Sequence, residues 1–473
     1  MQDLMVALPE ITILTMACVV LMVEVYRPDP ERKQVYWLSQ AALAAALFFT
    51  VAQAPSGRSL AFNGVFVADV MSTALKAVVL LVTLMVFAYS RHYLMERKSM
   101  KAEHFALGLF AVLGMMIIVS ANSFLTIYLG LELLSLSLYA MIAVERDSGD
   151  AAEAAMKYFV LGALASGMLL YGLSMLYGVT GSLDISQIAQ AVGAESKDSQ
   201  LLVFGLVFVV VGIAFKLGVA PFHMWLPDVY QGAPTAVTLF IGTAPKVSAF
   251  ALAFRLLVDG LPTLVADWRG MLMIMAVLSI AIGNVVAIAQ SNIKRMLAYS
   301  TIAHMGYLLL GLVAGTESGF AAAMFYAITY TLMSAAAFGM VILLGRIGFE
   351  SDQLDDFKGL SERSPWFALV MLIVMFSMAG VPPFVGFWGK WFVIKEVVAV
   401  GHVWLAALAV LFSIVGAFYY LRIVRLMYFE QPELTQAITP SRELRWVLSA
   451  NGIAVLVLGL MPGLLMELCV RAV

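Results

Sequence analysis

Long apolar runs separated by short polar segments follow one another along the whole chain. Crossing the ~30 Å hydrocarbon layer of a bilayer takes about 20 helical residues, and we predict a helix for each such run. The fourteen predicted helices cover residues 4–26, 36–54, 65–90, 104–119, 122–144, 155–179, 200–219, 234–258, 268–290, 295–314, 317–346, 366–399, 401–428 and 445–468. In the longest early polar interruption, 182–199, we expect a short amphipathic helix on the membrane surface. The pattern predicts an all-α, polytopic membrane protein.

Composition excludes a water-soluble enzyme. Of the 473 residues, 62% are hydrophobic and 12% are charged, whereas about 25% are charged in an ordinary soluble domain. The mean hydropathy is +0.95, and no soluble core could bury that much apolar surface. The spans also leave no room for a globular domain that could hold a flavin, a nucleotide or a cluster.

The two cysteines give no sign of a metal centre. Cys18 and Cys469 lie near opposite ends of the chain, whereas an iron–sulfur cluster takes four cysteines or a close substitute. We expect both to be small core residues. No spaced ligand set and no glycine-rich phosphate loop indicates a metal, haem or nucleotide site.

The distribution of basic residues predicts the orientation of the chain. With the N-terminus outside, eighteen of the 28 basic residues fall on inside loops and the adjoining helix ends. Five fall on outside segments, namely Arg58, Lys197, Arg255, Arg269 and Arg471. Because inside loops carry the excess of lysine and arginine, we expect both termini outside and an even number of spans.

Two Gly/Pro breaks interrupt corresponding apolar segments. Gly218–Phe222 (GVAPF) closes the seventh predicted span, and Gly380–Phe384 (GVPPF) interrupts the twelfth, 162 residues later. Paired breaks of this kind are typical of repeated transporter halves with broken helices at the membrane midplane, and a chance proline kink is the alternative. Because the breaks lie an odd number of spans apart, we predict two inverted five-helix repeats.

These repeats define the predicted domains. We expect an N-terminal three-helix segment at 1–103 and a first repeat at 104–258. The second, inverted repeat is expected at 259–428, followed by the C-terminal fourteenth helix at 429–473.

The remaining five basic residues fall within predicted spans. They are Lys76, Lys216, Lys246, Lys390 and Lys395. Glu132 also lies in the middle of an apolar run. A charge there costs several kcal/mol unless it is paired or reached by water, and it marks an ion or proton pathway by default.

The buried acid and lysines favour proton transfer. An ammonium in a low-dielectric interior gives up its proton more readily, and a nearby carboxylate holds it back. A Glu–Lys pair that can part and rejoin, such as Glu132 with a buried lysine, is therefore a switchable proton donor. The breaks beside Lys216 and Lys390 free carbonyls that can hold water. The alternative is a static ion pair that joins two helices.

Other polar residues in the spans are less specific. His304 lies beside Ser300, Thr301 and Tyr307 in the tenth predicted span and could relay protons, although a hydrogen-bonded core histidine would look the same. His223 follows the first break and could lie at the mouth of the path. Asp69 and Lys76 share a helix face and are interpreted as a structural pair.

Three stretches closely resemble the antiporter-like membrane subunits of respiratory complex I. They are FKLGVAPFHMWLPDVYQGAPTAVTLFIGTAPKVSAF (215–250), QSNIKRMLAYSTIAHMGYLLL (290–310) and MAGVPPFVGFWGKWFVIK (378–395). The resemblance covers most of the chain from about 104 to 428. The opening LPEITILTMACVVLMVEVY, the lysine in the twelfth span and the short C-terminus indicate one branch of that family. Where many relatives have a second proline in GAPTPVTAF, this chain has Ala236.

The resemblance implies roles for particular residues. Glu132 matches the buried glutamate of the family, Lys216 its partner lysine and Lys246 its central relay lysine, while Lys390 matches the terminal lysine and His304 a polar position on the central axis. The chain would then be a proton-pumping module of the bacterial inner membrane. FMN, iron–sulfur clusters and quinone would be bound by other subunits, and the membrane partners would be a neighbouring antiporter-like subunit and small membrane subunits. No nucleic acid is implied.

Other functions stay open at this point. A subunit of a multi-subunit cation/proton antiporter shares the fold and the charges, and a membrane-bound hydrogenase module is a lesser possibility. A purely structural membrane subunit with frozen ion pairs is the alternative from another class.

Overall fold

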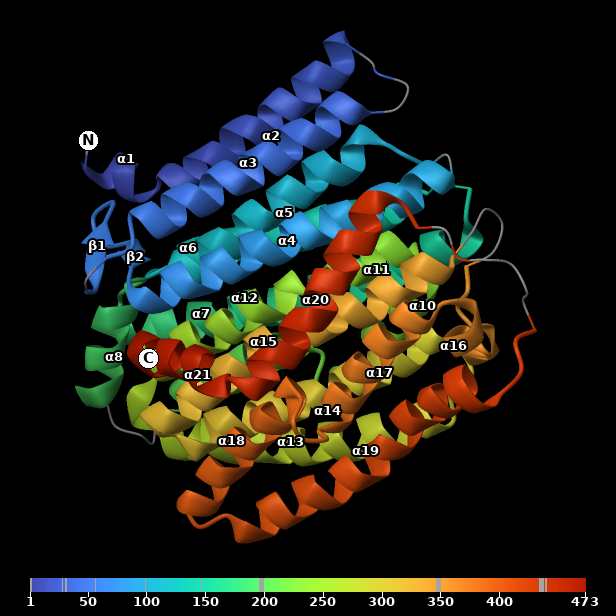
Figure 1. Cartoon of the computed structure of the whole chain (residues 1–473). Coiled ribbons are helices and arrows are strands. Elements are labelled where there is room, and N and C mark those ends of the chain that lie inside the picture. The colour runs from blue at the N-terminus through green and yellow to red at the C-terminus, as the bar shows by residue number, and fades with distance from the viewer. Residues whose placement is uncertain are drawn as a thin grey trace.

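Long helices packed side by side make up almost all of the computed structural model (Figure 1). The structure describes every residue except 1, 28, 30, 31, 56, 98, 146, 195–199, 346–349, 434–437 and 439. Within the described residues, 13 helical stretches are long and apolar enough to cross a membrane. They are α2 (Leu8–Tyr26), α3 (Lys33–Ala52), α4 (Val70–Glu96), α5 (Ala102–Ser120), α6 (Phe124–Ala143), α7 (Gly149–Thr180), α9 (Gln200–Leu217), α11 to η1 (Thr235–Asp259), η2 with α13 (Pro262–Ile288), α14 (Ile293–Ala314), α15 (Glu317–Leu344), α19 (Val403–Phe429) and α20 (Arg442–Leu460).

The remaining predicted span, 366–399, is divided by the second break. Its halves are α17 (Pro365–Ala379) and α18 (Val385–Ala399), each of 15 residues. The first break is followed by a further short helix, α10 (Trp225–Gly232), which the hydropathy pattern did not predict.

Glycines in the left-handed region end the helix before each break. Gly218 has a φ of +79° and Gly380 has a φ of +88°. Their backbone N–H groups donate to Ala214 O at 2.9 Å and to Phe376 O at 3.1 Å, respectively. Glycine is favoured there because it adopts positive φ without steric cost. The two breaks therefore share one backbone conformation.

Three further predicted spans are not continuous helices. The eighth consists of α11 (Thr235–Ile241), α12 (Ala244–Ala253) and the π-helix η1 (Phe254–Asp259). The first is divided into α1 (Gln2–Val6) and α2, and the last into α20 and α21 (Pro462–Ala472). Prolines near the starts of α2, α12 and α21 explain these boundaries, because proline is favoured in the first helical turn and disfavoured in a helix interior.

The third predicted span begins later than expected. A two-stranded antiparallel hairpin, β1 (Ser59–Ala61) and β2 (Phe66–Ala68), occupies its predicted start, with Leu60 opposite Val67. The helix α4 then begins at Val70 because Asp69 forms a capping box with Ser72.

Smaller helices lie in the connections. The expected surface helix is α8 (Ile185–Ala194), and 195–199 of that polar segment, including Lys197, lie outside the described residues. The turn η3 (Leu354–Phe357) and the short α16 (Leu360–Arg363) precede α17.

Two helices and the eighth span form the centre of the bundle. The apolar window of α15 is fully buried, and α14 and the α11–η1 stretch are almost as deeply enclosed. The helices α2 and α3 lie at one edge, α19 lies at the opposite edge, and α20 crosses between them (Figure 1). Both ends of the chain lie at the same end of the bundle, near the β-hairpin (Figure 1).

One cysteine prediction was wrong. Cys469 is buried as expected, whereas Cys18 is exposed on α2. An exposed position on an apolar helix at the edge of the bundle is compatible with contact with lipid or a neighbouring chain, which hydropathy alone does not distinguish from a core.

Candidate functional site

Lys216 lies in the last turn of α9, directly before the first break. Its Nζ donates a hydrogen bond of 2.7 Å to Ser135 Oγ on α6. The Ser135 hydroxyl in turn donates to Leu131 O at 2.6 Å. The lysine is therefore held by a neutral oxygen and not by a carboxylate.

Glu132 lies one turn before Ser135 on the same helix. Its charge acts on Lys216, yet among the described residues the two form no ion pair within 4.0 Å. Glu132 Oε1 is buried and accepts no hydrogen bond from any described residue. The structure thus brings the expected acid and lysine close together and leaves their ion pair open.

Lys246 is buried on α12, at the centre of the bundle. Its Nζ donates to Leu217 O at 2.9 Å and lies 5.3 Å from the ring centroid of Trp225. Leu217 is the last residue of α9. The last carbonyls of a helix lack intrahelical partners and carry partial negative charge, so they stabilise a cation.

Lys390 is buried on α18, beyond the second break. Its Nζ donates to Ala379 O at 2.9 Å and to Ser413 Oγ at 3.0 Å. Ala379 is the last residue of α17. The side chain passes so close to Gly380 that a Cβ there would lie 2.9 Å from Lys390 Cδ. The break therefore provides both an acceptor for the ammonium and space for its stem.

His304 is buried on α14 between two tyrosine hydroxyls. Its Nδ1 lies 2.7 Å from Tyr326 Oη and its Nε2 lies 3.0 Å from Tyr420 Oη. Tyr420 Oη lies 2.5 Å from Ser300 Oγ, which extends the chain of polar groups along α14. Of the neighbours expected from the sequence, Ser300 joins this chain and Tyr307 instead donates to Ala409 O.

The tyrosines beside His304 were missed by the sequence analysis. Tyr326 comes from α15 and Tyr420 from α19, and nothing in the local pattern of either helix connects them to His304. The charge of Lys390 also acts on His304. The fold thus connects the tenth span to the second break.

The predicted pair of Asp69 with Lys76 was wrong. Asp69 accepts from Arg255 Nη2 at 2.7 Å, whereas Lys76 Nζ lies 2.5 Å from Glu10 Oε1. The two residues share a helix, but Asp69 turns towards the bundle centre as the cap of α4 and Lys76 turns towards α2. Burial disfavours the charged carboxylate, but Arg255 and Ser72 outweigh that effect and lower the pKa of Asp69 from its ordinary value.

Arg255, which the sequence analysis counted with the outside segments, lies at the end of the eighth span. It is buried in the π-helix at the end of the eighth span and also donates to Asp259 Oδ2 at 2.8 Å. Arg255 therefore forms ion pairs with Asp69 and Asp259 at the end of this span.

The five candidate residues lie in a part of the chain that matches a known protein family. The model of the family described as NADH:quinone oxidoreductase/Mrp antiporter, TM, matches residues 121–416, a range that includes all five candidate residues. The chain is 58% identical to NADH-quinone oxidoreductase subunit N of Thioalkalivibrio sulfidiphilus, covering 100% of this chain and 98% of that protein. It is 59% identical to the protein of the same name from Thiobacillus denitrificans, covering 99% and 97%. The chain belongs to the NADH-quinone oxidoreductase subunit N family.

Solved structures agree with this assignment. A chain of respiratory complex I from Thermus thermophilus matches with a TM-score of 0.84 at 33% identity, covering 98% of this chain and 100% of that one. A chain of the Mrp complex from Dietzia sp. DQ12-45-1b matches with a TM-score of 0.86 at 22% identity, covering 99% and 97%, and shares the fold. The family and the branch expected from the sequence motifs are confirmed.

In this subunit N family member, the position 162 residues before Lys390 has a different role. Asp228, on α10, accepts from Lys157 Nζ at 2.7 Å and from Arg295 Nη1 at 2.8 Å in a partly exposed cluster. The two breaks therefore match in backbone conformation but not in charge.

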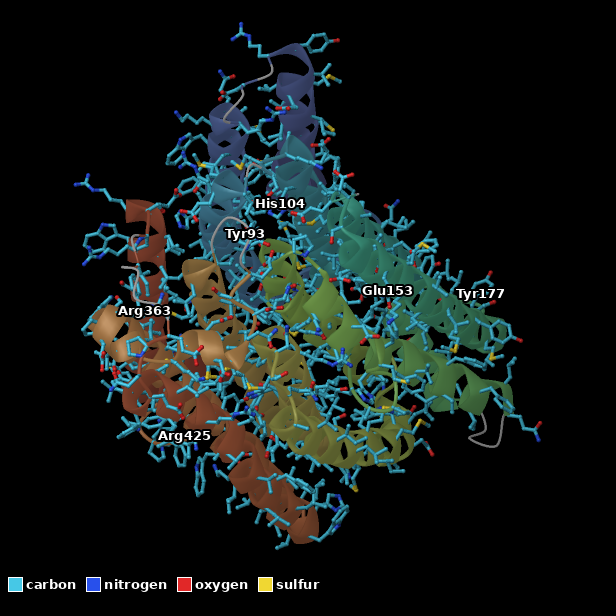
Figure 2. The ribbon with its side chains drawn as sticks, turned by 90° about the vertical axis from the view of Figure 1, so that its right-hand side faces the viewer. Tyr93, His104, Glu153, Tyr177, Arg363 and Arg425 are labelled. Atoms are coloured by element: carbon cyan, nitrogen blue, oxygen red, sulfur yellow. The ribbon has the colours of Figure 1, made fainter. Side chains whose placement is uncertain are left out.

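A polar network at the end of α4 was not foreseen. Tyr93 Oη lies 3.1 Å from both carboxylate oxygens of Glu350, which also pairs with Arg97. Burial, and then the charge of Glu350, raise the pKa of Glu145 in the neighbouring loop. Figure 2 looks onto this end of the bundle, with Tyr93 on α4 and Glu153 on α7 labelled. The carboxylates of Glu350 and Glu145 therefore interact at the end of the bundle where α4 ends.

Proposed function

We propose that the chain translocates protons as the subunit N of an NADH-quinone oxidoreductase, using Glu132, Lys216, Lys246, His304 and Lys390 as its relay. The observation that carries this proposal is the set of acceptors around the lysines. Among the described residues, the ammonium groups of Lys216, Lys246 and Lys390 donate to hydroxyl and carbonyl oxygens and to no carboxylate. A carboxylate partner would favour the charged ammonium, whereas a neutral oxygen does so less, so these lysines release a proton more readily.

The relay begins at the first break and ends at the second. Lys216 receives or releases a proton as its pair with Glu132 closes or opens. Lys246, held at the end of α9, lies next along the bundle. His304 exchanges protons with the tyrosine hydroxyls on both of its ring nitrogens, and Lys390 completes the path at the end of α17. Because the charges of Lys390 and His304 oppose each other, a proton on one favours its departure from the other.

The architecture of the proposal follows the predicted domains. Residues 1–103 form the three-helix segment, 104–258 and 259–428 form two repeats of opposite orientation, and 429–473 complete the bundle. The shared conformation of the two breaks supports two copies of one backbone unit. The common location of both termini (Figure 1) supports an even number of crossings. We place both termini on the outer side of a bacterial inner membrane.

Electron transfer belongs to other subunits in this proposal. FMN, the iron–sulfur clusters and quinone would be bound by partner chains, while this chain contacts a neighbouring antiporter-like subunit and small membrane subunits. Their redox reaction would supply the energy that opens and closes the charge pairs here.

Two other functions make different predictions. An antiporter subunit is favoured by the shared fold with a chain of an Mrp complex. A structural subunit with frozen ion pairs fits the Glu10–Lys76 contact, but not the open arrangement of Glu132 and Lys216.

Copurification separates these functions. We expect an affinity-tagged chain to copurify with a large complex that reduces quinone with NADH and drives proton uptake into vesicles. Purification with cation/proton exchange subunits, and without NADH oxidation, would contradict the proposal and favour the antiporter.

A further inference from the structure

Ser135 accepts the hydrogen bond of the Lys216 ammonium. It lies three residues after Glu132 on α6, so both side chains share one helix face. The Lys216 ammonium sits on the Ser135 hydroxyl at 2.7 Å. A lysine side chain on its flexible four-carbon stem can reach either residue from one position on α9.

The second acceptor on this face is available. Glu132 Oε1 is buried and accepts no hydrogen bond from a described residue, while the carboxylate interacts with Tyr128, one turn earlier, and with Tyr139. A buried carboxylate oxygen without a donor is costly. The closed Glu132–Lys216 pair would satisfy it, so the open arrangement persists only if another group compensates the lysine.

Ser135 also borders an internal space. A cavity of about 30 Å³ is lined by Ser135, Lys216, Tyr158 on α7 and Ser248 on α12. A space of about 10–15 Å³ suffices for one water molecule. Ser248 lies two residues after Lys246, so the cavity extends from the Lys216 ammonium towards the helix that carries the next lysine.

We propose that Ser135 is a positioning residue that stabilises the open state of the Glu132–Lys216 pair and keeps the Lys216 ammonium beside the cavity that faces α12. The inference rests on the proposed function. The carboxylate holds the ammonium as an ion pair, whereas the hydroxyl offers a single neutral acceptor and leaves the remaining N–H groups free. When the Lys216 ammonium moves from the Glu132 carboxylate to the Ser135 hydroxyl, it leaves its ion pair and can donate a proton towards Lys246.

The second break has a similar arrangement. Lys390 Nζ also donates to a serine hydroxyl, Ser413 Oγ, at 3.0 Å. Ser413 lies on α19, after the helix that carries Lys390, whereas Ser135 lies on α6, before the helix that carries Lys216. A serine acceptor thus accompanies the lysine at both breaks.

The test uses serine variants in the complete complex. In Ser135→Ala the open state loses its acceptor, and we expect proton uptake per vesicle to fall about tenfold, since a hydrogen bond to a charged group shifts a two-state population by at least that factor. Ser135→Thr retains the hydroxyl and should stay within about twofold of the wild type. Ser137→Ala is the matched control, because among the described residues the Ser137 hydroxyl bonds only Leu133 O on the same helix, and it should pump normally.

A high-resolution structure of each assembled variant supplies the second readout. We expect Lys216 Nζ to lie on the Glu132 carboxylate in Ser135→Ala and on the hydroxyl in Ser135→Thr. Wild-type proton uptake in Ser135→Ala, or an unmoved Lys216, would overturn the inference.

The proposed function is tested separately by Lys216→Ala. If that variant pumps normally, the relay itself is wrong. If Lys216→Ala is impaired while Ser135→Ala pumps normally, only the role of Ser135 is lost.

Discussion

Lys246 and Lys390 donate to corresponding carbonyls at the two breaks, although they occupy different elements. Lys246, on α12, bonds Leu217 O, and Lys390, on α18, bonds Ala379 O, each at 2.9 Å. Leu217 and Ala379 are 162 residues apart, the same interval that separates Gly218 from Gly380. The last residue of the helix before each break therefore provides a carbonyl acceptor for a buried lysine, and the two lysines come from different elements. A path built in this way has chemically distinct ends, which directional transport requires.

Glu132→Ala and Lys216→Ala should each strongly impair NADH-driven proton uptake, because each removes one partner of the switch. Lys395→Ala is the control, since Lys395 lies on α18 with 64% of its side chain exposed. Proton uptake and NADH oxidation are measured in vesicles after assembly has been checked. Normal translocation in both fully assembled variants would show that the pair has no role in transport.

Lys390→Arg should assemble but lose much of its proton translocation. Arginine retains the positive charge beside Ala379 O and Ser413 Oγ. A guanidinium, with a pKa above about 12, nevertheless releases protons far less readily than a buried ammonium. Lys395→Arg on the same helix is the matched control. Wild-type pumping by Lys390→Arg would identify Lys390 as a structural charge.

His304→Gln tests proton exchange in the centre of the bundle. A glutamine amide can still donate to one tyrosine and accept from the other, but it cannot carry a proton between Tyr326 and Tyr420. We expect an assembled complex with strongly reduced proton uptake. His402→Gln, outside the spans, should behave like the wild type. Equal proton uptake in His304→Gln and His402→Gln would show that His304 is a hydrogen-bonded core residue and not part of the relay.

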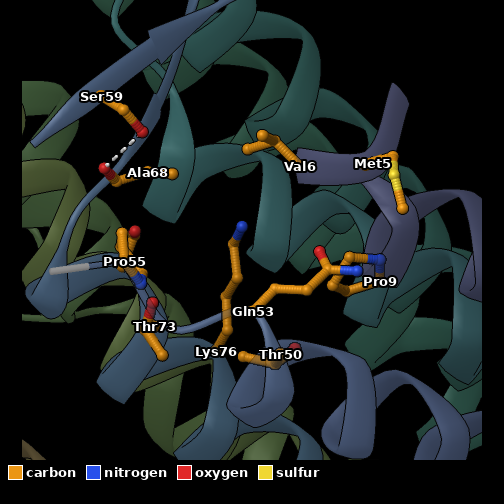
Figure 3. A pocket seen from close by; sticks show the side chains of 11 residues that line it. Met5, Val6, Pro9, Thr50, Gln53, Pro55, Ser59, Ala68, Thr73 and Lys76 are labelled. Atoms are coloured by element: carbon orange, nitrogen blue, oxygen red, sulfur yellow. Dashed lines mark hydrogen bonds between the residues drawn. The ribbon is translucent and has the colours of Figure 1, made fainter. Parts of the chain in front are cut away.

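The Glu10–Lys76 contact should stabilise the three-helix segment without contributing to transport. Both side chains are buried, and Lys76 reaches from α4 into a pocket of about 210 Å³ (Figure 3). Removing one partner from a buried pair costs about 3–5 kcal/mol, whereas replacing both with apolar residues is often neutral.

Glu10→Ala should therefore lower the thermal stability of the purified complex, and the double variant Glu10→Leu, Lys76→Met should recover most of it. The recovered complex should pump like the wild type. A pumping defect in a stable double variant would assign this pair to the proton path instead.

The sequence alone predicted the long apolar helices, the two Gly/Pro breaks, and the burial of Lys216, Lys246 and Lys390. These are local properties: a span needs about 20 apolar residues, a Gly/Pro pair ends a helix where it stands, and a lysine among apolar neighbours is costly wherever they fold. The same reasoning drew attention to the five candidate residues, and the resemblance of three stretches to known sequences indicated the family.

Only the tertiary structure decided which groups those charges contact. A shared helix face suggested Asp69 as the partner of Lys76, but Lys76 forms an ion pair with Glu10 of another helix. His304 lies against Tyr420, 116 residues away in sequence, and Lys216 bonds Ser135, 81 residues away, in place of the nearby glutamate. Each of these side chains bonds an acceptor that helix packing brings within about 3 Å. The sequence of one helix does not show which side chains of another helix lie beside it.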